Sequence, residues 1–136
     1  MDALFGGEGD GLGIPAEGLG AVRAVREGLP VEAVEQVQQG GRLSLAEVDR
    51  LILPRKTLDH RRKLGRLTPD QSDRLMRVAR LLALAEETFG PDRARLWLRR
   101  PTSALEGEAP LDLLDTDAGA RAVETVIGRI AHGIAA

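Results

Sequence analysis

The residues of this sequence best suited to chemistry are cationic, and many of them gather in the stretch LPRKTLDHRRKLGRLT at positions 53–68. Arginine and lysine bind phosphate oxygens or the O6 and N7 acceptors of guanine, and threonine can do either. The stretch is therefore a candidate DNA-binding segment, the alternative being a solvated basic face on an ordinary helical hairpin. The candidate DNA contacts are Arg55, Lys56, Thr57, His60, Arg61 and Arg62.

The sequence contains few residues that could support catalysis. The absence of cysteine excludes disulfides, thiolate metal sites and cysteine nucleophiles. The two histidines, His60 and His132, lie far apart in the sequence. Asp112, Asp115 and Asp117 are close together, but they flank an expected helix start, where the helix dipole favours carboxylates. We therefore expect neither enzyme activity nor a bound metal or cofactor.

The formal net charge of −2 is unevenly distributed along the 136 residues. Residues 50–100 contain fourteen basic and six acidic side chains, a net charge of +8. The flanking segments 1–49 and 101–136 carry net charges of −6 and −4. A basic middle between acidic flanks indicates more than one binding surface.

Composition and periodicity predict an all-α protein. Aromatic residues make up only 2%, and no long segment alternates with the period of a strand. Capping boxes at Ser44–Glu47 and Thr68–Gln71 mark two helix starts. The expected helices cover residues 16–27, 31–39, 44–53, 55–64, 69–89 and 92–99, followed by one turn at 111–114 and a last helix capped by Thr116.

Apolar residues at helical spacing define the expected inner faces. We also expect Asp70 to pair with Arg74, Asp73 to pair with Arg77, and Trp97 to fill the core between helices. The leucines of 111–114 are expected either in the core or at a partner contact, and Gly119 at a position of close packing. The inner-face residues are Leu19, Val22, either Val25 or Arg26, Val31, Val34, Val37, Leu45, Val48, Leu51, Ile52, Leu58, Leu64, Leu75, Val78, Ala79, Leu82, Ala85, Phe89, Val123, Ile127, Ile130 and Ile134.

The helices at 44–53 and 55–64, joined by a tight turn, have the spacing of a helix-turn-helix. In that motif the second helix lies in the major groove of DNA, and its early residues contact base edges. The basic residues lie on this second helix, which favours DNA binding over a solvated face. Paired half-sites also require a dimer, and the wide apolar stripe of helix 69–89 makes it the expected dimer surface.

The second half of the chain resembles the Xre/MbcA/ParS family of antitoxins, and the resemblance extends upstream to cover about residues 20–135. It rests on an ordered set: Trp97-Leu98, Pro101, Leu105-x-Gly107-x-x-Pro110-Leu-Asp-Leu-Leu114, Thr116-x-x-Gly119 and His132-Gly133. The resemblance implies a type II antitoxin with a helix-turn-helix domain and a helical toxin-binding domain. It also implies a homodimer that represses its own operon together with its toxin.

The partner implied by the resemblance is a RES-domain toxin, an enzyme that consumes NAD or transfers ADP-ribose from it. In this family the C-terminal end approaches or enters the active site of the toxin. On this chain the role falls to Arg129, His132, Gly133, Ile134, Ala135 and Ala136.

The expected organisation has three parts: a flexible glycine-rich leader at 1–14, a helix-turn-helix domain at 15–66 and a toxin-binding domain at 67–136. The start MDALFGGEGD has no basic and apolar regions of a signal peptide, and no apolar run approaches the ~20 residues of a membrane span. We expect a cytoplasmic protein without membrane contact. The alternative function is a stand-alone helix-turn-helix regulator without a toxin partner.

Overall fold

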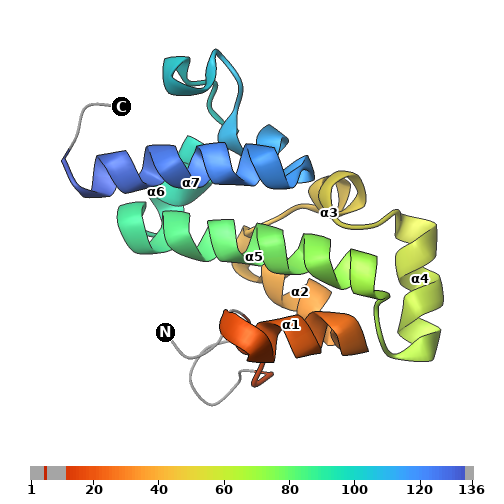
Figure 1. Ribbon diagram of the computed structural model, residues 1–136. Helices are drawn as coiled ribbons and strands as arrows, with labels where there is room; N and C mark the ends of the chain where they lie inside the picture. The colour runs from red at the N-terminus through yellow and green to blue at the C-terminus, as the bar shows by residue number, and fades with distance from the viewer. Residues whose placement is uncertain (1–4, 6–11, 134–136) are drawn as a thin grey trace. The chain divides into compact units, whose positions relative to one another are not determined.

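The computed structural model describes residue 5 and residues 12–133, and this part of the chain contains helices and no strand. The all-α prediction is confirmed (Figure 1). Two isolated bridges, Pro30 with Arg66 and Thr102 with Glu108, are the β-type pairings of the described residues. The elements are α1 Gly18–Glu27, α2 Glu32–Gln38, η1 Gln39–Gly41, α3 Leu45–Leu51, α4 Arg55–Leu64, α5 Pro69–Phe89, α6 Pro91–Arg99, η2 Ser103–Leu105, η3 Pro110–Asp115 and α7 Asp117–Ala131.

The chain divides into two compact units, residues 1–79 and residues 80–136. The division falls within α5, which contributes its first half to unit 1 and its second half to unit 2. The sequence predicts a domain boundary between residues 66 and 67. These residues lie in the loop before α5, upstream of the division between the two units. None of the helices in the described part of the chain is long and apolar enough to cross a membrane.

Both predicted capping boxes of unit 1 are confirmed. The backbone N–H of Glu47 donates to Ser44 Oγ at 3.1 Å, and the N–H of Ser44 donates to Glu47 Oε1 at 2.9 Å. Thr68 and Gln71 exchange the equivalent bonds at 2.9 and 3.2 Å. These bonds satisfy backbone donors that the first turns of α3 and α5 leave unpaired.

A short backbone pairing holds the end of α4 to the loop before α2. The N–H of Val31 donates to the Gly65 carbonyl at 3.1 Å, and the N–H of Leu67 donates to the Leu29 carbonyl at 2.9 Å. The Leu29 N–H donates in turn to the hydroxyl of Ser72, a fully buried residue of α5, at 2.8 Å. The loop is thereby fixed to both α4 and α5.

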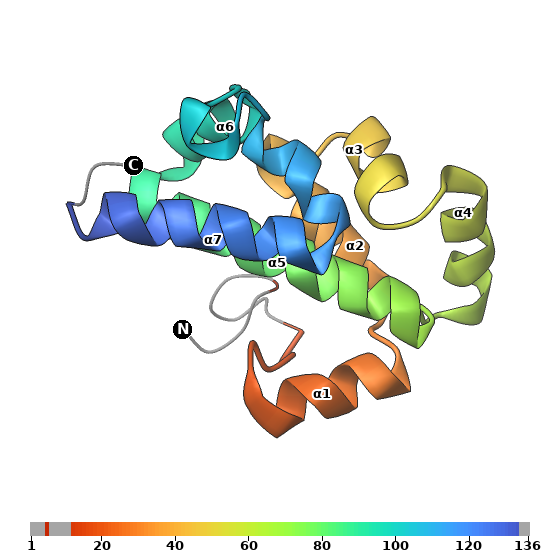
Figure 2. The same cartoon turned by 45° about the horizontal axis from the view of Figure 1, so that its top comes forward.

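Several predicted inner-face residues of unit 1 are exposed. Leu19 and Val22 of α1 are 69% and 40% exposed, because α1 lies at the edge of unit 1 and buries none of its residues (Figures 1 and 2). Leu45, the first residue of α3, and Leu64, the last of α4, project from helix ends and are about half exposed. For these four residues the prediction of burial is wrong. It is confirmed for Val48, Leu51, Ile52 and Leu58.

The apolar stripe of α5 is buried within a single chain. Leu75, Val78, Ala79, Leu82 and Ala85 are at most 2% exposed, whereas Phe89 at the end of the helix is partly exposed. The reason for placing a dimer surface on this helix is therefore wrong, because the stripe is not available to a second copy.

Only one of the two predicted ion pairs on α5 is present. Arg77 pairs with Asp73 at 3.7 Å, as expected. Arg74 donates to the Ile52 carbonyl at 3.3 Å, instead of pairing with Asp70. The bond connects α5 to the residue that follows α3, so this arginine supports tertiary packing rather than its own helix.

Unit 2 is built around η3, which packs on both α6 and α7. Leu111 and Leu114 of η3 are buried, which confirms the core role of these leucines. Gly119 in α7 is needed for close packing, since a Cβ there would overlap the Leu113 carbonyl oxygen. Val123 and Ile127 are buried as expected, and Ile130 is partly exposed. Residues 1–4 and 6–11 of the leader and Ile134 lie outside the described residues.

Candidate functional site

The candidate DNA-binding site begins with the turn between α3 and α4 (Figure 2). The two helices contact each other, and α3 also contacts α2. Ile52 and Leu53 in the turn are each 1% exposed, and the Leu53 N–H donates to the Val48 carbonyl at 3.1 Å. Leu58 anchors α4 from its buried side. The turn is therefore fixed by packing, and α4 has a defined orientation within unit 1.

The start of α4 is capped by a residue of the preceding helix. Pro54 occupies the N-cap position and has no side-chain acceptor to offer. Asp49 supplies the acceptor, since its Oδ2 receives the backbone N–H of Arg55 at 2.9 Å. Sequence reasoning missed this contact. Its signal is an aspartate six positions before a helix whose N-cap cannot bond.

The end of α4 is equally well held. Gly65 adopts φ +86°, the left-handed conformation that ends helices, and its N–H donates to the Arg61 carbonyl at 2.8 Å. Arg61 Nε donates to the Arg66 carbonyl at 2.8 Å, and Arg66 Nη1 donates to the Gly28 carbonyl at 2.7 Å. Both guanidinium groups thus take part in fixing the turn after α4.

The structure places all six predicted DNA contacts on α4 but separates them by their bonding. Arg61 is engaged with the Arg66 carbonyl, and Arg62 forms an ion pair with Asp59 at 3.0 Å. Among the described residues, Arg55, Lys56, Thr57 and His60 have no side-chain partner. Of these, Thr57 is partly exposed and the other three are exposed. Two free cationic side chains, Arg55 and Lys56, therefore lie in the first turn of the helix, the part that reaches base edges in a helix-turn-helix, and the exposed Lys63 lies in its last turn.

The second candidate site is the last turn of α7. Arg129 and His132 are exposed, and Gly133 ends the helix at φ +72° with its N–H donating to the Ile130 carbonyl at 3.1 Å. His132 Nδ1 lies 2.7 Å from the Gly128 carbonyl oxygen. A carbonyl only accepts, so Nδ1 carries the proton in this contact. Ile134, Ala135 and Ala136 lie outside the described residues.

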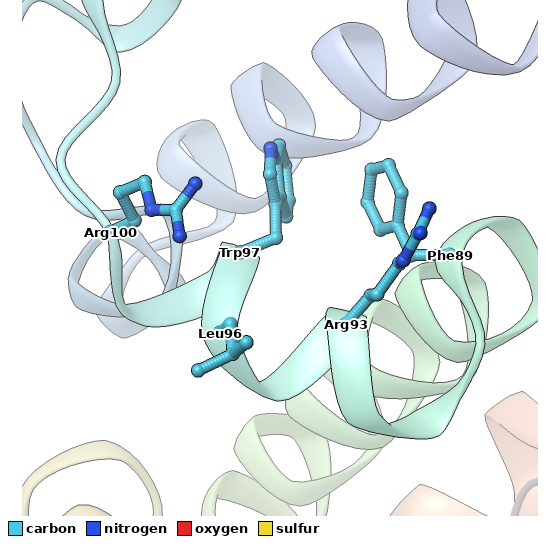
Figure 3. Close-up of a pocket in the computed structure, with 5 residues that line it drawn as sticks. All are labelled: Phe89, Arg93, Leu96, Trp97 and Arg100. Carbon is cyan, nitrogen blue, oxygen red and sulfur yellow. The ribbon is translucent and has the colours of Figure 1, made fainter.

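The sequence predicts Trp97 in the core between helices, and this prediction is wrong. Trp97 is partly exposed, and its ring stands against Phe89 with centroids 4.9 Å apart (Figure 3). Helical spacing does not distinguish a buried tryptophan from one at the surface, because either can lie on a helix face rich in apolar residues.

Of the three clustered carboxylates of unit 2, Asp117 stabilises its own helix. Asp117 in the first turn of α7 pairs with Arg121 at 2.7 Å, and the preceding Thr116 caps the helix by accepting the Gly119 N–H at 2.9 Å. No group of three or more potential metal ligands occurs within residues that the structure describes.

Comparison with known proteins gives two adjacent domain matches. Residues 20–80 match the antitoxin Xre-like helix-turn-helix domain, and residues 84–133 match the antitoxin Xre/MbcA/ParS C-terminal toxin-binding domain. The first match contains α4 and its free cations; the second contains Trp97 and the last turn of α7.

Individual relatives align over most of the chain. A protein of Yersinia enterocolitica named antitoxin Xre is 32% identical over 128 residues, covering 90% of this chain and 86% of the relative. An antitoxin Xre of Photorhabdus laumondii is 33% identical with the same coverage. A protein of a Sphingobium species named Prs ADP-ribosylating antitoxin is 35% identical over 77 residues, about half of either chain.

Proposed function

Because this chain belongs to the Xre/MbcA/ParS family of antitoxins, we propose that it neutralises a RES-domain toxin by direct binding and represses their shared operon by binding operator DNA. The observation that carries the proposal is that each of the two units has a candidate binding surface of its own. Free cations occupy the start of α4 in unit 1, and an exposed helix end closes unit 2. One chain can therefore hold DNA and a protein at different places.

The toxin-directed part of the proposal assigns the last turn of α7 and the tail to the active-site cleft of the toxin. Arg129, His132 Nε2 and the residues beyond Gly133 supply the contacts. The net charge of −4 over residues 101–136, from carboxylates that lie between Glu106 and Glu124, supports contact between unit 2 and a toxin that presents cationic groups around the pyrophosphate of NAD. The chemistry belongs to the toxin, and this chain acts without catalysis of its own.

The reaction that the chain blocks is the removal or transfer of ADP-ribose from NAD. Its support is the Sphingobium relative, whose name refers to ADP-ribosylation of Prs. The name leaves two chemistries for the partner of this chain, hydrolysis of NAD and modification of a protein. Incubating the partner with NAD labelled in the adenine ring separates them, because only the second attaches the label to protein.

The DNA-directed part assigns Arg55, Lys56, Thr57 and His60 to the major groove. Arg61 and Arg62 act at the phosphate backbone from the second half of α4, using the donors that their internal bonds leave free. A homodimer in the cytoplasm presents two such helices to paired half-sites. Light scattering of the purified chain at micromolar concentration tests the dimer, and a monomeric mass contradicts it.

The second candidate function is a stand-alone regulator, which the same helix-turn-helix would serve. Deleting residues 129–136 separates the two. The last fully buried residue of α7 is Ile127, so the truncated chain should keep its core and its DNA binding. An antitoxin should lose neutralisation of the co-expressed RES toxin, measured as growth of the host cell. Full neutralisation by the truncated chain would contradict the role of the tail, and failure of the intact chain to bind any RES protein would favour the regulator.

A further inference from the structure

A shallow apolar groove lies at the junction of α5 and α6, within unit 2. Its volume is about 320 Å³, and the aromatic pair of Phe89 and Trp97 forms its base. Figure 3 shows the two rings on the same side of α6, between the side chains of Arg93 and Arg100. Leu96 also lines the groove and is 64% exposed. A tryptophan and a leucine so placed offer an unfilled apolar surface.

The cations at the rim of the groove have no counter-charge of their own. Arg93 and Arg100 are exposed and form no ion pair with any described residue. Arg95, on the same helix, is paired with Asp92 at 4.0 Å. An occupant that carries carboxylates beside an apolar side chain would therefore complement both the rim and the base of the groove.

The groove lies at the same end of unit 2 as the proposed toxin-binding end of α7. Figures 1 and 2 both show the α5–α6 junction and the C-terminal end of α7 at the same end of unit 2. A stable protein interface involves about 20–30 residues on each side, far more than the last turn of α7 and a short tail provide. A second contact region is therefore required, and aromatic and arginine residues are the ones that most often dominate interface energy.

We infer that the Phe89–Trp97 groove is the second half of the toxin-binding surface, and that it receives an apolar side chain flanked by carboxylates from a surface segment of the toxin. This inference rests on the proposed function, since it takes the partner to be the RES toxin. The tail blocks the active site, and the groove supplies affinity and selects the cognate toxin by its acidic segment.

The test measures the affinity of the purified RES toxin for four groove variants of the intact chain by calorimetry. Leu96→Glu and Arg93→Glu should each lower the affinity at least tenfold, because they place a carboxylate against those of the occupant. Arg93→Lys should keep most of the affinity. Trp97→Ala should weaken binding similarly, and the exposed Leu96 variant remains informative if the loss of the tryptophan prevents folding. Leu19→Glu in α1 and Arg121→Glu in α7 are the matched controls, and both should bind as the unmodified chain does.

The outcomes separate this inference from the proposed function. If the unmodified chain binds the toxin and the deletion of 129–136 abolishes neutralisation, but Leu96→Glu and Arg93→Glu bind normally, the groove has no role and the inference alone fails. If the intact chain does not bind the toxin, both fail. If Leu96→Glu instead lowers the mass of the free protein in light scattering, the groove is occupied by a second copy and the inference is overturned.

Discussion

The carboxylate of Asp49 in α3 caps the backbone of Arg55 in α4, with Oδ2 accepting the N–H at 2.9 Å. The bond crosses the turn of the helix-turn-helix and fixes the first residue of the helix proposed to enter DNA. It also brings a negative charge to the base of that helix, where the N-terminal dipole stabilises it. The cap and the free cations of α4 therefore occupy the same helix end.

Asp49→Ala should lower the free energy of unfolding by about 1 kcal/mol, the usual value of a helix cap. The reason is that Pro54 cannot replace the lost acceptor. Asp49→Asn keeps a side-chain oxygen and should retain most of the stability. Urea unfolding of both variants checks this, and equal midpoints for the alanine and asparagine variants would show that the cap contributes nothing.

Arg55→Ala and Lys56→Ala should each weaken binding to a DNA fragment from the promoter of the chain's own operon. Because a cation in the major groove also lies near phosphates and releases their counterions, its loss should reduce the slope of log affinity against log salt, by about 0.9 for each phosphate neutralised. Gel shifts at several salt concentrations measure both effects. Arg121→Ala removes the same charge from α7 and serves as the control. Unchanged affinity in both α4 variants would show that other residues contact the DNA.

Gly119→Ala and Gly128→Ala, both in α7, should have opposite effects on stability. A Cβ at position 119 overlaps the Leu113 carbonyl, so about 1–3 kcal/mol should be lost. A Cβ at position 128 meets no atom within 4 Å, so alanine should add about 0.5–1 kcal/mol by restricting the unfolded chain. Thermal unfolding followed by circular dichroism gives both values, and the same sign for both variants would contradict the packing of α7 on η3.

Gly28→Ala should destabilise the chain more than Gly65→Ala. Both glycines have positive φ, +90° and +86°, so both substitutions should incur the strain of about 1–2 kcal/mol expected there. Only at position 28 would the new Cβ also overlap a backbone atom, the Leu67 carbonyl oxygen. Urea midpoints of the two variants give the comparison. Equal losses would mean that the loop before α2 is free to move away from residues 65–67.

Ser72→Ala should lower the free energy of unfolding by about 1–3 kcal/mol, because it leaves the buried Leu29 N–H without an acceptor. Thr125→Ala is the matched control. The Thr125 hydroxyl is exposed and donates to the Arg121 carbonyl of its own helix, so its loss should change stability little. A loss at position 72 no larger than at position 125 would contradict a structural role for the buried hydroxyl.

The sequence alone determined the features that depend on neighbours a few positions away. Helix starts at Ser44 and Thr68 follow from capping boxes that span four residues, and the end at Gly65 follows from the freedom of glycine to adopt positive φ. The absence of strand pattern determined the all-α fold. The concentration of arginine and lysine on the second helix of a short pair likewise placed the candidate DNA contacts on one element.

Only the tertiary structure decided which apolar residues are buried and which cations are free. Leu19 and Leu64 have the spacing of core residues but lie at an edge and at a helix end, where no other element covers them. Arg55 and Arg61 are both arginines of the same predicted helix, and the sequence does not distinguish them. In the structure the side chain of Arg61 donates to the Arg66 carbonyl, whereas the side chain of Arg55 has no partner among the described residues. The contact between the rings of Phe89 and Trp97 could not be predicted from the sequence either. The physical reason is that burial and bonding of a side chain depend on elements remote in sequence, whereas helix formation depends on bonds between residues a single turn apart.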